Sequence, residues 1–263
     1  MLNFKFTSFA CLLICGIILG LSTLGLISWY WIWIPIIVYL HLLVFGAIYI
    51  QWNFYTVSKN KLTDLLTENE LPPNALLLTF DDGIHPIHTL HILDQLKEQQ
   101  VQACFFLIGK NIPGHEAIVK RIFDEGHVIG NHSDQHAFWF DMQSSANMLA
   151  EIKFCNERIR SITGQNPIYF RPPYGVTNPN LAKAIRQSNL QSIGWNLRSM
   201  DTVAKSSQQL LDTLRQKTKP HQIVLLHDRC EITAQVLTDY IIFCKQQGFN
   251  FARIEANPNA VLV

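Results

Sequence analysis

Charged side chains are missing from a long N-terminal stretch of this 263-residue chain. Residues 6–58 contain no Asp, Glu, Lys or Arg. A bilayer-spanning helix needs about 20 apolar residues, so the stretch is long enough for two of them. We therefore expect a transmembrane helical hairpin with helices at about 6–27 and 33–52. Aromatic residues gather at 29–33 and again near Trp52, where the two membrane interfaces would fall.

The rival explanation for this stretch is a cleaved signal sequence. The apolar core of a signal peptide usually spans only about 7 to 15 residues and ends at a small-residue cleavage site. A lipoprotein signal ending at Cys15 would need a small residue before it, whereas Ile14 is bulky. The length of the uncharged stretch favours two membrane spans over either signal, and hence an integral protein of a bacterial inner membrane.

Positive charges flank the uncharged stretch at its two ends and are missing from its middle. Lys5 precedes it, and Lys59 and Lys61 follow it. By the positive-inside rule, both ends of the hairpin are expected on the cytoplasmic side, together with the rest of the chain. A cell-wall polymer lies on the other side, so this expectation favours a lipid-linked or intracellular glycan precursor over the finished polymer.

The chain also lacks the patterns of several other protein classes. Its six cysteines include no C-x-x-C pair and are scattered along the chain, so a disulfide framework is not expected. The net charge is +1, and no basic stripe with interleaved aromatic residues indicates a nucleic-acid partner. Nothing in the sequence requires a protein partner either. The partners to expect are a lipid bilayer and a small or polymeric substrate.

Two adjacent carboxylates, Asp81 and Asp82, are the most informative feature of the remaining chain. They follow the apolar run 75–78, and burying both at the end of a strand is costly unless a cation neutralises one of them. His132 and His136 follow a second short apolar run about fifty residues later. One carboxylate and two imidazoles four residues apart are typical of a hydrolytic metal site with open positions for water and substrate. The second carboxylate is then free to act as a base.

Apolar, β-rich runs alternate with amphipathic stretches over the rest of the chain. This alternation predicts parallel strands covered by helices, and its repetition predicts a closed or nearly closed (β/α) barrel. The expected strands are 75–80, 101–108, 127–130, 168–170, 191–195, 223–227 and 250–255, and the expected helices are 86–99, 114–125, 142–162, 178–188, 206–217 and 231–247. The polar motif residues all follow strands, at the face where barrel enzymes build their active sites.

Two more motifs continue the pattern, Arg-Pro-Pro-Tyr-Gly at 171–175 and Leu-Leu-His at 225–227. With Thr-Phe-Asp-Asp-Gly at 79–83 and His-Ser-Asp-Gln-His at 132–136, the sequence resembles the polysaccharide deacetylase (NodB-homology) family, carbohydrate esterase family 4. The motifs stand in the family's order within about 75–255. The resemblance implies a distorted (β/α)7–8 barrel, here preceded by the transmembrane hairpin. We divide the chain into the hairpin (1–53), a linker (54–74), the deacetylase domain (75–256) and a tail (257–263).

The resemblance implies a role for each motif residue in hydrolysing the amide of an N-acylated amino sugar. Asp82, His132 and His136 would hold one divalent ion, with Zn²⁺ favoured by the ligand set and Co²⁺, Ni²⁺ or Mn²⁺ as substitutes. Asp81 would act as general base and Arg171 would orient it. The backbone N–H of Tyr174 would help to stabilise the oxyanion.

The departing amine needs a proton, and His227 is the expected general acid. Asp201 is the expected carboxylate that orients His227 and keeps it protonated. In the family this carboxylate belongs to a D-x-x-D-W segment, in which Arg198 and Thr202 replace the first Asp and the Trp here. Leu225 and Trp195 are expected to line the acyl pocket, although a plain core role suits Leu225 as well.

Three functions are therefore to be weighed. The first is deacetylation of an N-acetylated glycan, and the second is deacylation or deformylation of a lipid-linked amino sugar at the membrane surface. The third, of a different class, is glycan binding by a barrel without activity. A binding protein has no need of a base, an acid and a metal site together, so the residues favour a hydrolase of non-peptide carbon–nitrogen bonds.

Overall fold

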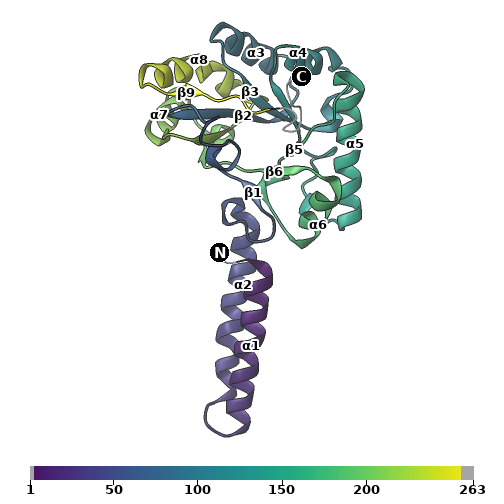
Figure 1. Ribbon diagram of the computed structural model, residues 1–263, viewed down its shortest axis with the longest axis vertical. Coiled ribbons are helices and arrows are strands. Elements are labelled where there is room, and N and C mark those ends of the chain that lie inside the picture. Colours follow the sequence, from purple (N-terminus) through teal and green to yellow (C-terminus); the bar gives the residue numbers. More distant parts are fainter. Residues whose placement is uncertain (1–2, 256–263) are drawn as a thin grey trace.

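The computed structural model describes residues 3–255 and shows a helical hairpin projecting from a helix-covered parallel sheet (Figure 1). Helix α1 (Phe4–Thr23) begins at Asn3, whose side chain accepts the Phe6 N–H at 3.0 Å. Helix α2 (Trp33–Ile48) returns alongside it after a short turn. Helix α1 and the segment Trp29–Ile48, which ends with α2, each have 20 residues and the apolar composition needed to cross a membrane. The expected tail, 257–263, lies outside the described residues.

The two hairpin helices end earlier than expected, and each end has a local cause. Helix α1 stops at Thr23 because Gly25, with φ +70°, takes a left-handed conformation that breaks the helical path. Helix α2 stops at Ile48 because the next residues turn toward the barrel. There Ile50 is only 2% exposed and packs in the same apolar cluster as Leu62 and Trp195. The base of the hairpin is therefore part of the barrel's core.

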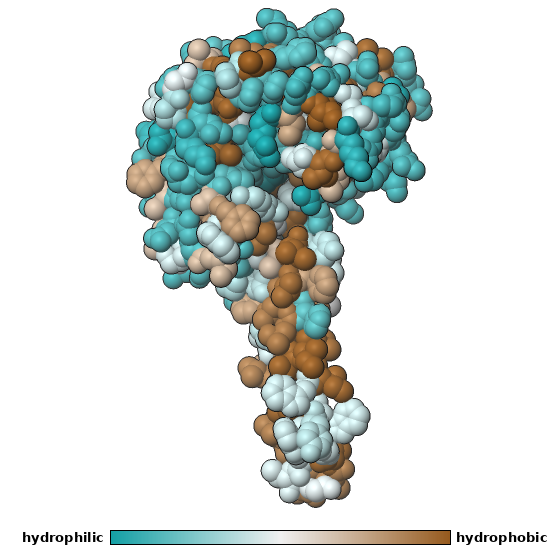
Figure 2. Space-filling model, turned by 180° about the vertical axis from the view of Figure 1, so that it is seen from behind, coloured by the Kyte–Doolittle hydropathy of each residue, from teal (hydrophilic) through white to brown (hydrophobic). Residues whose placement is uncertain are grey.

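The two parts of the molecule differ sharply in surface character (Figure 2). The barrel is covered mainly by hydrophilic residues, whereas apolar residues cover most of the hairpin. Almost none of the hairpin's apolar side chains are buried within the protein, since only 6% of each candidate span is buried. Water would solvate this surface poorly, so the hairpin is suited to an apolar environment.

A single sheet of nine parallel strands forms the wall of the barrel. The strand order is β1-β6-β5-β4-β3-β2-β8-β7, and β9 pairs with the start of β2. Their bounds are β1 (Ser58–Lys59), β2 (Ala75–Gly83), β3 (Ala103–Leu107), β4 (Val128–Asn131), β5 (Tyr169–Phe170), β6 (Gln191–Ile193), β7 (Leu197–Arg198), β8 (Gln222–His227) and β9 (Asn250–Phe251). Because the strands are parallel, their C-terminal ends meet along one edge, where every motif residue falls.

Two of these strands, β1 and β7, were not expected. Each has only two residues, one of them charged, and neither stands in an apolar run that would mark it in the sequence. Strand β1 lies within the range taken as a linker, 54–74, and pairs with β6 through Ser58 and Ser192. The hydroxyl groups of these two serines are also hydrogen-bonded at 2.7 Å. This segment therefore extends the sheet as well as joining the hairpin to it.

Six helices cover the outer face of the sheet (Figure 1). They are α3 (His88–Glu98), α4 (Glu116–Asp124), α5 (Ser145–Thr163), α6 (Pro179–Ser188), α7 (Ser207–Lys217) and α8 (Glu231–Gln246). Ser144, Asn178 and Ser206 cap the starts of α5, α6 and α7 by accepting backbone N–H groups. The main apolar core lies between α3, α4, α5, α7 and α8 and the strands β2, β3 and β8. A second core lies inside the curl of the sheet, and a third packs α6 against α5.

The packing of the hairpin's base on the barrel predicts a clear effect on stability. Truncating Ile50 to Ala leaves a cavity in the inner core, so we expect Ile50→Ala to lower the free energy of unfolding by about 2–4 kcal/mol. Denaturant unfolding of the full chain in detergent micelles measures this. The control is Val57→Ala, because Val57 is exposed and its truncation should cost less than about 0.5 kcal/mol. Equal effects of the two changes would show that Ile50 is not a core residue.

Candidate active site

Neighbouring strands bring the proposed base and acid together. Asp81 lies at the end of β2 and His227 at the end of β8, and the two residues are direct partners in the parallel register of these strands. Asp82 follows with φ +71°, a left-handed conformation that is strained for a residue with a side chain. Between Asp81 and Gly83 the register of β2 against β3 shifts at an irregularity. Strained backbone of this kind is concentrated at functional sites.

Asp82, His132 and His136 form the one group of three or more metal-ligating side chains within residues 3–255. Asp82 Oδ1 lies 3.5 Å from His132 Nε2 and 3.4 Å from His136 Nε2, and the three ligand atoms lie within 4.8 Å of one another. Two ligands of a tetrahedral Zn²⁺ ion, each at about 2.0–2.1 Å, stand about 3.3 Å apart. The spacing and the chemistry of these groups therefore fit one divalent ion.

Contacts behind the imidazoles prepare them as metal ligands. His132 Nδ1 lies 2.7 Å from the Arg171 carbonyl oxygen, which only accepts hydrogen bonds. Nδ1 therefore donates to this carbonyl, and Nε2 is the ring nitrogen that faces Asp82. Burial, followed by the neighbouring His132, lowers the pKa of His136 to about 4, which keeps its imidazole neutral. Both imidazoles thus turn Nε2 toward Asp82, where a cation would bind.

The charges around Asp82 favour its ionised form. Burial by itself raises the pKa of this carboxyl, but His132, His227 and Arg229 outweigh burial and hold the pKa well below its ordinary range. The two oxygens of Asp82 face different partners, because Oδ1 points to the imidazoles and Oδ2 accepts a hydrogen bond from Arg229 Nε at 2.7 Å. One oxygen is thereby directed to the metal position.

Arg171 fixes Asp81 in place. Its Nη1 lies 2.7 Å from Asp81 Oδ1, and the arginine side chain is completely buried. Backbone carbonyls of Ile193 and Gly194 accept hydrogen bonds from Nε and Nη2, and the guanidinium lies over the Phe106 ring at 4.2 Å. A guanidinium held on every side cannot follow a moving partner, so it orients the carboxylate. Asp81 Oδ2 is left 3.8 Å from His132 Nε2, beside the metal position.

The structure also pairs His227 with Asp201. Asp201 Oδ1 lies 2.7 Å from His227 Nδ1, while Oδ2 accepts the His227 backbone N–H and the Thr233 hydroxyl, each at 2.7 Å. Burial lowers the pKa of His227, but Asp201, Asp81 and Asp82 outweigh burial and raise it above its ordinary value. With Nδ1 donating to Asp201, Nε2 is the ring nitrogen able to deliver a proton to substrate.

Removing the charge of Asp201 should change the pH dependence of the reaction. A general acid must be protonated, so the rate falls as pH rises through its pKa. Since Asp201 raises the pKa of His227, Asp201→Asn should move the alkaline limb of the kcat/KM profile to lower pH. The matched control is Asp212→Asn on α7, where the carboxylate is exposed. If the alkaline limb of the kcat/KM profile falls at the same pH in Asp201→Asn as in wild type, Asp201 does not set the pKa of the general acid.

Asp81, Asp82, His132, His136 and His227 all line one cavity of about 420 Å³ at the C-terminal ends of the strands, while Arg171 and Asp201 lie behind its wall. Tyr174, Trp195 and Leu225, expected in the substrate pocket, line it as well. Tyr174 has φ +59°, and its main chain lies beside Gly175, where a Cβ atom would overlap the Trp195 ring. The Arg-Pro-Pro-Tyr-Gly motif therefore needs its glycine for a close approach. The role of the Tyr174 N–H as an oxyanion donor stays a prediction.

Sequence reasoning missed two side chains that contact Asp82 or its neighbours. Arg229 follows the Leu-Leu-His motif directly and pairs with Asp82 Oδ2. Asn111 donates from Nδ2 to the carbonyl oxygens of Asp82 and Gly83 at 3.1 and 3.3 Å, which supports the strained turn. The position of Arg229 next to a motif was the available signal, whereas nothing in the sequence singles out Asn111.

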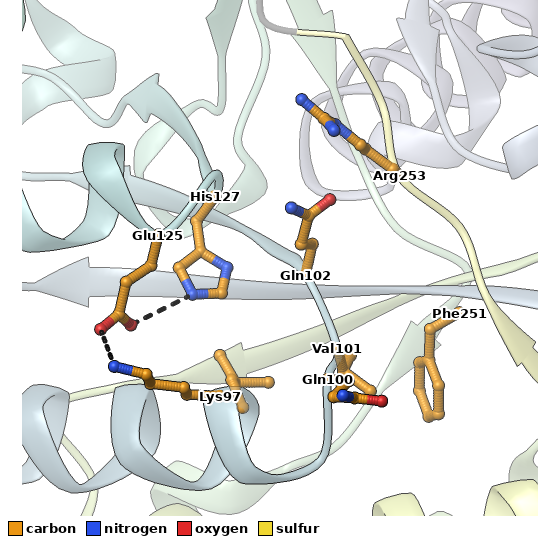
Figure 3. Close-up of a pocket in the computed structure, with 9 residues that line it drawn as sticks. Lys97, Gln100, Val101, Gln102, Glu125, His127, Phe251 and Arg253 are labelled. Carbon is orange, nitrogen blue, oxygen red and sulfur yellow. Dashed lines mark ion pairs between the residues drawn. The ribbon is translucent and has the colours of Figure 1, made fainter.

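A second cavity, also of about 420 Å³, lies at the opposite ends of β3 and β4 (Figure 3). In this cavity Glu125 Oε1 lies 3.8 Å from Lys97 Nζ, and Oε2 lies 4.0 Å from His127 Nε2. Burial lowers the pKa of His127 to about 4, so this imidazole is neutral. The N-terminal ends of barrel strands contribute to stability rather than catalysis. The catalytic candidate is therefore the cavity around Asp81 and Asp82.

Known proteins are similar to this chain in sequence. A family profile described as polysaccharide deacetylase matches residues 68–193. The peptidoglycan-N-acetylmuramic acid deacetylase PdaA of Bacillus subtilis (strain 168) is 32% identical over 185 residues, which cover 69% of this chain and 70% of that protein. This chain belongs to the polysaccharide deacetylase family. The resemblance seen in its motifs is thereby confirmed.

Other members of the polysaccharide deacetylase family agree in sequence and in fold. The chitooligosaccharide deacetylase of Rhizobium leguminosarum bv. trifolii is 34% identical, over 69% of this chain and 81% of that protein. The Bc1960 peptidoglycan N-acetylglucosamine deacetylase, known from a crystal structure, has a sequence 30% identical to this chain. The two structures superpose with a TM-score of 0.65, over 69% of this chain and 87% of the Bc1960 chain. The expected NodB-type fold is confirmed as a curled half-barrel. The protein is a hydrolase of non-peptide carbon–nitrogen bonds, a glycan deacetylase.

Proposed function

We propose that this polysaccharide deacetylase is a membrane-anchored, metal-dependent enzyme that removes N-acetyl or other short acyl groups from an amino-sugar glycan. The observation that carries the proposal is the triangle of Asp82, His132 and His136, with Asp81 and His227 beside it on adjacent strands. Metal ligands, a base and an acid within one cavity are what hydrolysis of a stable amide requires.

The residues divide the reaction between them. A divalent ion at the three ligands supplies a Lewis acid for the acyl carbonyl and makes water more acidic. Asp81, held by Arg171, takes a proton from the attacking water as its oxygen bonds to the carbonyl carbon. His227 gives its Nε2 proton to the sugar nitrogen as the carbon–nitrogen bond breaks, and Asp201 stabilises the imidazolium beforehand. The Tyr174 N–H would face the developing oxyanion, and Leu225 and Trp195 would enclose the acyl group. The products are a carboxylic acid and a free amine.

The choice of metal follows from the ligand set. Two imidazoles and one carboxylate suit Zn²⁺, and Co²⁺, Ni²⁺ or Mn²⁺ are the expected substitutes. Elemental analysis of the purified chain identifies the bound ion. About one equivalent of Zn²⁺ per chain is the expected result.

A barrel that only binds glycan is the alternative of a different class. It does not account for the buried pair of Asp81 and Arg171 beside the metal ligands, nor for the carboxylate held against His227. An N-acetylated chitooligosaccharide incubated with the full chain in detergent micelles decides between the two. Release of acetate with an equal amount of free amine supports the enzyme, whereas binding without release supports the bare binding barrel.

A second substrate class, a lipid-linked amino sugar, is favoured by the position of the cavity relative to the hairpin. Gln51, just after α2, donates from Nε2 to the carbonyl oxygen of Trp195, which lines the cavity. Thr177, two residues after the cavity-lining Gly175, donates its backbone N–H to the Ala47 carbonyl of α2 at 2.9 Å. The catalytic cavity therefore lies beside the end of the candidate membrane span.

Exposed apolar side chains also lie beside the catalytic cavity, in the loop before α5. Phe138, Trp139 and Met142, in the loop before α5, are 69%, 66% and 74% exposed. The Phe138 ring lies 6.3 Å from that of Tyr174, and the Asp141 carbonyl accepts a hydrogen bond from Asn178, next to Thr177. Such a surface next to a membrane hairpin suits the bilayer interface. A polyprenyl-linked amino sugar, compared with the soluble oligosaccharide, tests this substrate class.

The charges flanking the hairpin predict which side of the membrane the barrel occupies. Lys5 lies before α1, Lys59 and Lys61 lie after α2, and the turn between the helices has no charge. We therefore expect both ends of the hairpin in the cytoplasm. A fluorescent protein fused after Val263 should fluoresce, and alkaline phosphatase fused there should be inactive. Active phosphatase with a dark reporter would place the barrel outside, next to the wall polymer.

A further inference from the structure

Two arginines, Arg198 and Arg229, line the catalytic cavity, whereas the buried Arg171 does not. Arg198 lies on the short strand β7 and Arg229 in the turn between β8 and α8. The Arg198 side chain is exposed, and within residues 3–255 no hydrogen bond or ion pair engages its guanidinium. Hydrolysis as derived above uses neither arginine, so both are available for substrate.

Contact with Asp82 fixes the position of Arg229 but leaves most of its donors unused. Only Nε is engaged, by Asp82 Oδ2 at 2.7 Å, and the side chain is still 52% exposed. No other acceptor contacts this guanidinium within the described chain. Asp82 Oδ1 faces His132 and His136, so the same carboxylate can serve a cation on one side and Arg229 on the other. The two Nη groups of Arg229 remain as donors at the cavity wall.

The charge of the cavity favours an anionic ligand. The carboxylates of Asp81 and Asp82 are balanced by the guanidiniums of Arg198 and Arg229 among the lining residues. A divalent ion at the three ligands would add two positive charges, and no other carboxylate lines the cavity to offset them. Arg171, behind the wall, adds a further positive charge next to Asp81. A neutral acetylated glycan makes no use of this excess, whereas planar guanidiniums are well suited to binding carboxylate and phosphate groups.

The register of the strands places the two arginines close to the reacting groups. Arg198 pairs with Leu225 across β7 and β8, and His227 and Arg229 follow at the second and fourth positions after Leu225. We propose that Arg198 and Arg229 bind a carboxylate or phosphate group carried by the amino-sugar substrate near its N-acyl group. This rests on the proposed function. The group has two sources, an acidic substituent of the sugar itself or the phosphate that joins the sugar to a lipid carrier.

The test compares wild type with Arg198→Gln on three substrates. They are a neutral N-acetylated chitooligosaccharide, a muramic-acid-containing oligosaccharide with a free carboxylate, and an N-acetylated sugar joined to a polyprenyl chain by a phosphate. We expect Arg198→Gln to lower the ratio of kcat/KM for the preferred anionic substrate to that for the neutral one by about tenfold, as expected for loss of one charge-assisted hydrogen bond. Whichever anionic substrate shows the drop identifies the source of the charge.

Arg160→Gln is the matched control, because Arg160 is exposed on α5 at a different cavity. It should leave the ratio as it is in wild type. Arg229→Gln should lower the ratio too, and metal content measured in parallel separates this loss from a disturbed Asp82. An unchanged ratio in Arg198→Gln for both anionic substrates would overturn the anion site.

A binding measurement separates the anion site from the proposed reaction. The Asp81→Asn chain, loaded with Zn²⁺, is titrated with the carboxylated oligosaccharide and with the phosphate-linked sugar. Adding Arg198→Gln to it should weaken binding of the preferred probe about tenfold, and raising the salt concentration should weaken it further. If wild type releases no acyl group but binding still depends on Arg198, the proposed reaction fails and the anion site stands. Binding independent of Arg198 overturns the site whatever the activity.

Discussion

Asp81→Asn is expected to lower kcat by about a thousandfold while the protein keeps its metal ion. Asp81 is the carboxylate that does not belong to the metal triangle, and its Oδ2 lies beside that triangle at 3.8 Å from His132 Nε2. An asparagine oxygen can still accept the hydrogen bond from Arg171, but the amide cannot take a proton from water. Acetate release measures kcat, and elemental analysis of the same protein measures its metal content.

The choice of Asn over Ala at this position matters for the folded state. Arg171 is completely buried, and Asp81→Ala would remove both its counter-charge and its hydrogen-bond acceptor, at a cost of about 3–5 kcal/mol, whereas Asn removes the charge but keeps the acceptor. The thermal midpoint of Asp81→Asn should therefore be recorded with its activity. Asp124→Asn is the control, since Asp124 is an exposed partner of Lys120 on α4. A kcat within about threefold of wild type for Asp81→Asn would contradict its role as base.

His132→Ala and His136→Ala should each remove the metal together with the activity. Each change leaves two of the three ligands, so we expect metal affinity to fall by at least about a hundredfold. His132→Ala should have the larger effect on the surrounding structure, because His132 is buried and hydrogen-bonded to the Arg171 carbonyl. Metal content after dialysis against a competing chelator measures the loss directly, without reference to activity.

The chain offers a good control for these two histidines. His91 lies on α3 with an exposed side chain, in a run of histidines at 85, 88 and 91 that mimics a metal cluster in the sequence. His91→Ala should retain one equivalent of metal and wild-type activity. Retention of the ion by His132→Ala and His136→Ala, at the affinity of wild type, would show that the ion is held elsewhere.

The catalytic face was predictable from the sequence because its motifs follow strands. The apolar runs before Asp81, His132, Arg171 and His227 are long enough to indicate strands, and parallel strands bring their ends to one edge. The pairing of His227 with Asp201 was expected too, but from a strand at 191–195 beside 223–227; in the structure the unexpected strand β7, and not β6, lies beside β8. The geometry agrees with these expectations, while the chemical roles still depend on the experiments above.

Other features depend on tertiary contacts that leave no pattern in the sequence. Strands β1 and β7 have two residues each, and their pairing arises from the neighbours beside them. The early end of α2 follows from the burial of Ile50 in the barrel, although Ile50 reads as one more apolar residue of a span. The contact of Arg229 with Asp82 depends on the turn after β8, which brings together residues 147 positions apart.

The most direct test of the account is acetate release by the full chain after chelation and after metal is returned. We predict that exhaustive chelation abolishes release of acetate from an N-acetylated glycan, and that stoichiometric Zn²⁺ restores it in wild type. The Asp81→Asn chain should take up the same Zn²⁺ without recovering activity. Full activity of the chelated, metal-free protein would contradict the account.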